Sequence, residues 1–189
     1  MPITVVTPPT FEPITLREAK EHLRVIGTHE DALIESCITT AREVIEASTT
    51  RAICTQTMRM TMDYLPRDCI TLPRPPVQSV ASIKYIDTAG NQQTMDMGDY
   101  TVDLDAEPAR IVRAYGRTWP IAREQPGGVA VEFVAGWTQD NMPERVKHLC
   151  KLLVAHYYEH REPVIIGGGA SEIPMSARSL MRQLEWGAH

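Results

Sequence analysis

The chain of 189 residues has little of several features that would indicate a specialised class of protein. Its four cysteines, Cys37, Cys54, Cys69 and Cys150, form no CxxC pair and no zinc-ribbon spacing, so we expect reduced and mostly buried thiols. No apolar run approaches the roughly 20 residues that a membrane span requires. The first residues carry neither a basic region nor a long apolar run, which argues against a signal peptide. We therefore expect a soluble protein made in a reducing cytoplasm.

Basic charge is also in short supply. The chain has 19 Lys and Arg against 24 Asp and Glu, a formal net charge of -5. Because affinity for nucleic acid grows with the number of phosphates neutralised, this balance argues against general nucleic-acid binding. Apolar residues make up 43% and charged residues 23%, as in ordinary globular proteins. The length allows one ordinary domain or two small ones.

The N-terminal third has the pattern of two helices. Thr15 and Glu18 have the spacing of a capping box, which predicts that a helix begins there and runs to Gly27. Thr28 and Asp31 suggest a second cap, and an apolar stripe predicts a second helix over residues 29–48. Helices joined by so short a turn are expected to pack antiparallel. The apolar stripe of the first helix consists of Leu16, Ala19, Leu23 and Ile26.

From residue 52 to residue 136 the pattern changes to short runs of β-branched and alternating residues separated by proline, glycine and aspartate. This pattern is typical of an antiparallel sheet. The proline cluster at residues 72–76 is expected to be an exposed, extended connector, because proline donates no ladder hydrogen bond. The predicted strands cover residues 56–63, 80–87, 92–95, 100–103, 109–113 and 129–134.

Helical periodicity returns after Pro143 and ends before Pro163, which predicts a long and largely buried helix. Three glycines at 167–169 are typical of a hinge. Ser176 then has the position of a cap for a short helix. At about ten residues such a helix is marginal alone in water and needs a surface to lie on. Its apolar residues at helical spacing are Ala177, Leu180, Met181 and Leu184.

These elements predict an α+β protein, in which an antiparallel helical bundle carries an inserted antiparallel β-sheet region and a C-terminal tail helix. We expect an N-terminal helical hairpin at residues 1–51 and the β insertion at 52–141. A central helix at 142–163 would complete the bundle, and 164–189 would form a glycine-rich hinge and a docking helix.

One motif suggests an enzyme. His156, Glu159 and His160 fit the H-x-x-E-H pattern, in which two histidines bind zinc beside a glutamate base. A catalytic zinc also needs a third protein ligand, for which the chain offers Glu162, Glu172 and Glu185 downstream. We favour the interpretation that these are polar residues at the exposed end of an amphipathic helix. No metal, cofactor or catalytic residue is therefore assigned.

Other motifs have ordinary structural interpretations. The glycines at 167–169 lack the lysine of a phosphate-binding loop. The acidic run at residues 96–107 lacks the spacing of a calcium-binding EF-hand, so a solvated hairpin edge is favoured. Trp119 and Trp137 are expected to be core or interface anchors rather than stacking platforms for bases.

Taken in order, segments of the chain resemble the head-tail connector proteins of tailed bacteriophages, also called adaptor or head-completion proteins. The opening segment ITLREAKEHLRV at 14–25, followed by EDALI at 30–34, is similar to the start of that family. The resemblance covers residues 12–162. It continues through RAICTQT at 51–57, LPRPPVQSV at 72–80, DYTVD at 99–103, YGRTWP at 115–120, VEFVAGW at 131–137 and LLVAHYYEHR at 152–161.

This resemblance implies a non-enzymatic virion component. Such proteins form a ring, expected to be twelve-fold, beneath the portal, and they present a platform to the next neck or tail protein. The resemblance places the chain in the virion neck, and in the host cytoplasm during assembly. Its C-terminal segment would engage the portal. In this chain the portal-docking residues would be Ile173, Leu180, Met181, Leu184 and Trp186.

The charge distribution adds a hypothesis about such a ring. Residues 15–50 hold 4 basic and 7 acidic side chains. A mildly acidic channel would let DNA pass without specific binding, whereas a basic wall would retain it by counterion release. We expect the lumen to be lined by Glu30, Asp31, Glu35 and Glu43.

Two other functions remain open from the sequence. One is a small zinc metallopeptidase built on the H-x-x-E-H motif. The other is a monomeric intracellular binding module. The resemblance also leaves open whether the particle is a phage or a phage-derived particle such as a gene transfer agent.

Overall fold

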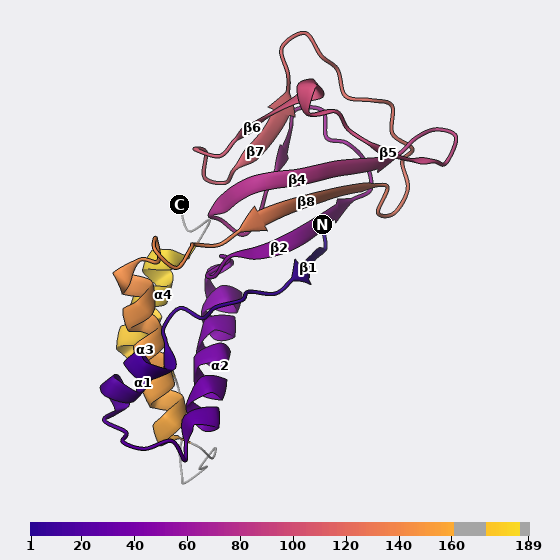
Figure 1. Cartoon of the computed structure of the whole chain (residues 1–189). Coiled ribbons are helices and arrows are strands. Elements are labelled where there is room, and N and C mark those ends of the chain that lie inside the picture. Colours follow the sequence, from indigo (N-terminus) through magenta and orange to yellow (C-terminus); the bar gives the residue numbers. More distant parts are fainter. Residues whose placement is uncertain (161–172, 186–189) are drawn as a thin grey trace, which may run out of the picture. The chain divides into compact units, whose positions relative to one another are not determined.

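The computed structural model describes residues 1–160 and 173–185, which divide into two units (Figure 1). The sheet unit comprises residues 1–10 and 55–136, and the helical unit comprises 11–54 and the described part of 137–189. The sheet unit therefore takes in the first ten residues, which the sequence analysis assigned to the N-terminal helical hairpin. The described residues form a mixed α and β protein with antiparallel sheets.

The larger sheet has five strands in the order β1-β2-β8-β4-β5. Its central strand β8 (Val129–Ala135) pairs antiparallel with both β2 (Gln56–Met62) and β4 (Val77–Ile86). Strand β8 alternates strictly between buried and partly exposed residues, with Val131 and Phe133 fully buried. This period of two places one face of the sheet in the core. The edges are β1 (Ile3–Thr7) and β5 (Gln92–Thr94).

The smaller sheet has three strands in the order β3-β7-β6. They are β3 (Cys69–Thr71), β6 (Tyr100–Asp103) and β7 (Arg110–Arg113), and a 3₁₀ turn, η1 (Met97–Asp99), leads into β6. Ile70 and Ile111 face each other across the β3–β7 pair, and both are fully buried. The six strands expected from the sequence are confirmed, although β4 begins at Val77, three residues early.

Two strands of the sheet unit were not predicted, and one expectation about the unit is wrong. Strands β1 and β3 were not predicted. The 72–76 connector is not exposed, because Leu72 and Pro75 are buried. Leu72 also donates its backbone N–H to the carbonyl of Ala109, so the segment is tied to the strand beside it.

The helical unit contains α1 (Leu16–Leu23), α2 (Asp31–Thr49), α3 (Glu144–Glu159) and α4 (Met175–Leu184). All four helices contribute to one apolar core, in which Ile34, Ile45, Leu149 and Leu153 have no exposed surface. The amphipathic periodicity read from the sequence is therefore confirmed for each helix. None of the helices in the described part of the chain is both long enough and apolar enough to cross a membrane.

The ends of the helices differ from expectation in several places. Helix α1 stops at Leu23, where Arg24 adopts a left-handed conformation with φ of 57°, instead of continuing to Gly27. Ile26 is consequently 91% exposed instead of joining the core stripe. Helix α2 begins after Glu30 without a side-chain cap from Thr28, and Ser176 lies inside α4 instead of capping it.

The capping box at the start of α1 is confirmed. The Thr15 hydroxyl accepts from the N–H of Glu18 at 3.2 Å, and the N–H of Thr15 donates to the Glu18 carboxylate at 2.8 Å. The backbone hydrogen bond from Thr15 lowers the pKa of Glu18. The charged carboxylate therefore stabilises the fold above its unfolded pKa, and this contribution is lost as the pH falls through the lowered folded value.

Replacing Thr15 by alanine should lower the free energy of unfolding by about 1 kcal/mol at neutral pH, because the backbone N–H of Glu18 loses the hydroxyl that accepts its hydrogen bond. Urea denaturation measures this difference. Thr28→Ala, which removes an exposed hydroxyl that caps no helix, is the matched control and should change stability by less than about 0.5 kcal/mol. Equal effects of the two substitutions would contradict the role of the capping box.

Candidate functional site

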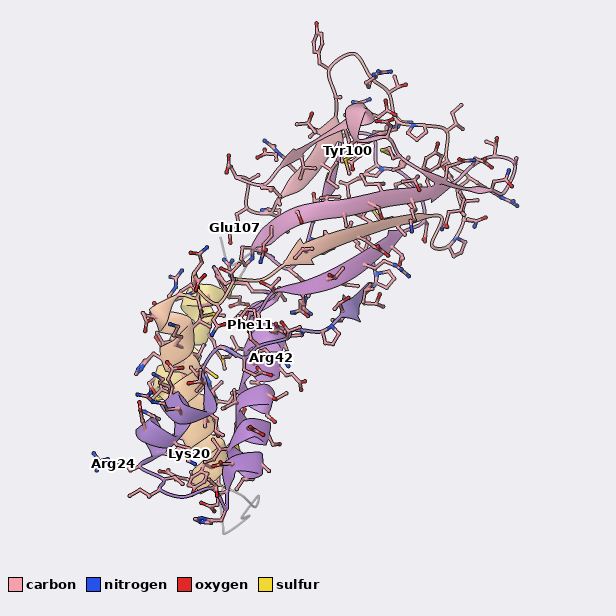
Figure 2. The ribbon with its side chains drawn as sticks, viewed as in Figure 1. Phe11, Lys20, Arg24, Arg42, Tyr100 and Glu107 are labelled. Carbon is pink, nitrogen blue, oxygen red and sulfur yellow. The ribbon has the colours of Figure 1, made fainter. Side chains whose placement is uncertain are left out.

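The segment before α1 is held to α2 by a partly buried ion-pair network around Arg42, which Figure 2 labels together with Phe11 of that segment. Arg42, whose side chain is 10% exposed, donates to Glu12 at 2.8 Å and to Glu46 at 3.2 Å. Thr39 also donates to Glu12, and the Glu46 carboxylate accepts the N–H of Ile53 at 2.9 Å. Burial disfavours the charged guanidinium, but its bonds and its attraction to both carboxylates outweigh this effect and raise the pKa of Arg42. Through Glu12 the network ties the segment before α1 to α2. Through Ile53 it ties the segment after α2 to the same helix.

The four acidic residues expected in a lumen fall into two pairs. Glu30 accepts a hydrogen bond from the Tyr158 hydroxyl, and Asp31 forms an ion pair with Lys20. Glu35 is exposed, and the side chain of Glu43 is 66% exposed at 3.7 Å from Arg42. The first pair therefore has a structural role inside the subunit, and the second pair presents charge on the surface of α2.

The residues expected to dock on a portal lie in and beside α4. Met181 and Leu184 are buried in the core of the helical unit, and Ile173 and Leu180 pack partly against it. The carbonyl of Leu184 also accepts a hydrogen bond from Arg51. Trp186 and the expected glycine hinge at 167–169 lie outside the described residues. In this conformation the apolar face of α4 covers the chain's own core.

The H-x-x-E-H motif lies at the last turn of α3. The rings of His156 and His160 have centroids 4.7 Å apart, and His160 Nδ1 is 3.0 Å from the backbone carbonyl of His156. Burial and the neighbouring His160 lower the pKa of His156. No group of three His, Cys, Asp or Glu side chains that could hold a metal ion occurs among the residues that the structure describes. Two of the expected third ligands, Glu162 and Glu172, lie outside them.

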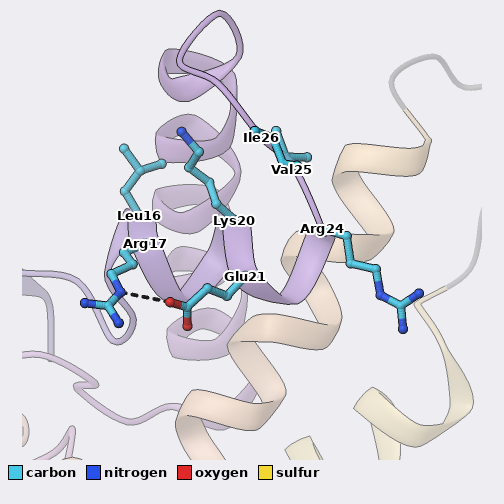
Figure 3. Close-up of a pocket in the computed structure, with 7 residues that line it drawn as sticks. All are labelled: Leu16, Arg17, Lys20, Glu21, Arg24, Val25 and Ile26. Atoms are coloured by element: carbon cyan, nitrogen blue, oxygen red, sulfur yellow. Dashed lines mark hydrogen bonds and ion pairs between the residues drawn. The ribbon is translucent and has the colours of Figure 1, made fainter.

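An open cavity of about 530 Å³ lies between α1 and the loop that follows it (Figure 3). Its lining combines the apolar residues Leu16, Val25 and Ile26 with charged residues, among them Arg17 and Arg24. Arg17 is paired with Glu21 at 2.8 Å, whereas Arg24 projects outward from the loop (Figure 2). Three of its lining residues, Arg24, Val25 and Ile26, follow the early end of α1, which sequence periodicity did not indicate.

The cysteines are free thiols, with Cys37, Cys54 and Cys150 buried and Cys69 partly exposed. Burial raises the pKa of Cys150 to about 12, and it also raises the pKa of Cys54. Since the thiolate is the reactive form, both should be inert in the folded chain.

Maleimide should therefore modify Cys69 and leave Cys37, Cys54 and Cys150 unmodified in the native protein, whereas all four should react in denaturant. Intact-mass and peptide mass spectrometry measure the sites. The Cys69→Ser variant is the control and should give no native labelling. Labelling of Cys54 or Cys150 as fast as Cys69 would contradict the burial that the structure shows.

The segment after β7 carries two exposed apolar side chains. Tyr115 is fully exposed and Ile121 is 81% exposed. Between them lies Trp119, whose Nε1 is the one buried side-chain nitrogen or oxygen in the described residues without a hydrogen-bond partner. The sequence indicated that Trp119 anchors a core or an interface, but the unpaired donor is visible only in three dimensions.

Comparisons with known proteins agree with this architecture. The family model for the head completion protein matches residues 12–175. A subunit from the neck of an empty gene transfer agent (GTA) particle, computed with C6 symmetry, is 26% identical with a TM-score of 0.80. A subunit from the virion of a native GTA particle is 26% identical with a TM-score of 0.78. A subunit from the neck of a native GTA particle, computed with C12 symmetry, is 26% identical with a TM-score of 0.75.

In all three cases the similarity covers 98% of this chain and 95% of the other chain. Comparison with curated proteins gave no match. The family match spans most of the sequence and both structural units, so it does not rest on one motif. This chain belongs to the head completion protein family.

Proposed function

We propose that this chain is the adaptor of a virion neck, where it forms a ring that connects the DNA-filled head to the tail or to the next neck protein. The observation that carries this function is the similarity to GTA neck subunits over nearly the full length of both chains. Family membership points to the same role. The protein is located in the neck of the particle.

The ring consists of copies of this chain, and we infer twelve of them beneath the portal. The C12 symmetry of the native GTA neck supports this number. The shared core of α1 to α4 supports a helical unit that acts as an antiparallel bundle in the ring. The role is structural, with no bond made or broken in the host or the particle. Stoichiometric zinc that is lost in His156→Ala would favour the metallopeptidase instead.

Portal docking is assigned to the C-terminal segment, through Ile173, Leu180, Met181, Leu184 and Trp186. In the free subunit α4 covers the helical core with the same apolar face. We therefore propose that this face moves from the chain's own core to a groove of the portal during assembly. An amphipathic helix of this kind can dock in a groove of a partner protein. Until the portal is present, α4 would stay on the chain's own core.

We further propose that Glu35 and Glu43, with Glu30 and Asp31 behind them, give the ring an acidic lumen. The exposure of Glu35 and Glu43 on α2 supports this assignment for these two residues. DNA would then pass through the ring without specific binding. A strongly basic lumen in an electron microscopy reconstruction would contradict the assignment.

Particles assembled without this chain test the function directly. The expected result is DNA-filled heads that carry portals but no tails, and purified wild-type chain added to these heads should restore joining. The Thr28→Ala variant is a folded control that should restore it equally. Tailed, infectious or transducing particles made in the absence of the chain would overturn the proposed function.

A further inference from the structure

Charge is sharply divided along the segment that contains β6 and β7. Residues 96–107 hold five acidic and no basic side chains, and residues 108–123 hold four arginines and no acidic side chain. Two pairs form within the chain, Arg110 with Asp103 at 2.8 Å and Arg117 with Asp99 at 3.7 Å. Asp105 and Arg113 are exposed, and no ion pair is recorded for either among the described residues.

These two exposed charges lie at opposite ends of one hairpin. Strands β6 and β7 are antiparallel, with Tyr100 opposite Arg113 and Asp103 opposite Arg110. The turn at residues 104–109 therefore lies at one end of the hairpin, which Glu107 marks in Figure 2. Arg113 lies at the other end. The turn also presents an apolar side chain, because Leu104 is 42% exposed.

A cavity of about 490 Å³ adjoins the Arg113 end. Leu65, Trp119 and Ile121 give it apolar walls. Arg67 and Arg113 contribute two positive charges, and Asp68 and Glu124 contribute two negative charges. Trp119 is one of its lining residues, but its indole N–H is a buried atom without a hydrogen-bond partner. The cavity thus combines an apolar wall with Arg113, an exposed cation that has no ion-pair partner among the described residues.

We propose that this cavity receives the 104–109 turn of a second copy of this chain. Leu104 of the incoming turn packs on Ile121, and the carboxylate of Asp105 pairs with Arg113. The inference rests on the proposed ring. The two surfaces lie at different ends of one hairpin, so each copy offers one end to each neighbour. Such a head-to-tail contact closes into a ring when the rotation allows it.

Charge reversal tests this contact in complexes of the full chain with purified portal, with ring occupancy measured by native mass spectrometry. Asp105→Arg and Arg113→Glu should each lower the affinity of subunits for the ring at least tenfold, because each puts like charges together. The double variant should regain most of that loss. Arg145→Glu, on the exposed face of α3, is the control and should assemble as the wild type does.

Cross-linking identifies the partner and does not depend on the charge variants. In a Cys69→Ser background, Leu104→Cys combined with Ile121→Cys should give a ladder of covalent oligomers with a short bis-maleimide. Each single cysteine variant should give none, because the contact joins two different surfaces.

The outcomes separate the two proposals. If the wild-type chain forms no ring on the portal, the proposed function fails, and this inference fails with it. If the wild type forms rings but the double variant is not restored and no ladder appears, only the present inference is overturned. A cross-link to the portal instead of a second copy would also overturn it.

Discussion

Arg42→Ala should lower the free energy of unfolding of the helical unit by about 3–5 kcal/mol, the range found when one partner of a buried ion pair is removed. The Glu46 side chain is 14% exposed and that of Glu12 is 30% exposed, so both carboxylates would lose their countercharge away from bulk water. Urea denaturation followed by far-ultraviolet circular dichroism reports the unfolding of the helices.

Two further variants serve as comparisons for this prediction. Arg17→Ala removes an arginine of similar pairing distance whose side chain is 87% exposed, and it should cost less than about 0.5 kcal/mol. Arg42→Lys keeps the charge but not the branched donor geometry. It should therefore lower the free energy of unfolding by an amount between those for Arg17→Ala and Arg42→Ala. A loss below 1 kcal/mol for Arg42→Ala would show that the network is not needed to hold the N-terminal segment.

Leu184→Asp should detach α4 from the helical core and abolish portal binding. Leu184 is 2% exposed, so a carboxylate there would be buried without a partner. The lost apolar contact alone is worth about 2–5 kcal/mol, and the buried charge adds to it. Limited proteolysis measures the release of α4, and co-sedimentation with purified portal measures docking.

The exposed face of the same helix supplies the control. Gln183→Asp introduces the same charge one residue away at an exposed position, and it should leave both proteolysis and portal binding unchanged. Portal binding by Leu184→Asp at wild-type affinity would show that the apolar face of α4 is not the docking element. Loss of portal binding in both variants would assign docking to the exposed face of α4 instead.

The elements that the sequence predicted are those whose periodicity is strong and local. Each helix carries an apolar stripe of its own, and β2 and β8 alternate along their whole length. Strand β1 lacks such a pattern, because four of its five residues are exposed, and it is an edge strand defined by its pairing with β2. Its partner is about fifty residues away in sequence, and no local signal specifies that pairing.

Local sequence patterns also did not predict where α1 ends or which residues pair in the candidate site. The stop of α1 depends on the left-handed Arg24 and on the Lys20 ammonium, which contacts the carbonyl of Gly27 and Asp31 of the next helix. Arg42 looks like an ordinary polar residue in sequence, since Glu12 lies 30 residues before it. The same is true of Trp119, because only the folded chain shows that its donor has no acceptor.

A reconstruction by electron cryomicroscopy of the full chain bound to its cognate portal tests the central claim most directly. The account predicts a closed ring of this chain on the portal, with the C-terminal segment in contact with portal density and a continuous channel through the centre. Single subunits that leave the portal vertex bare at saturating concentration would contradict it.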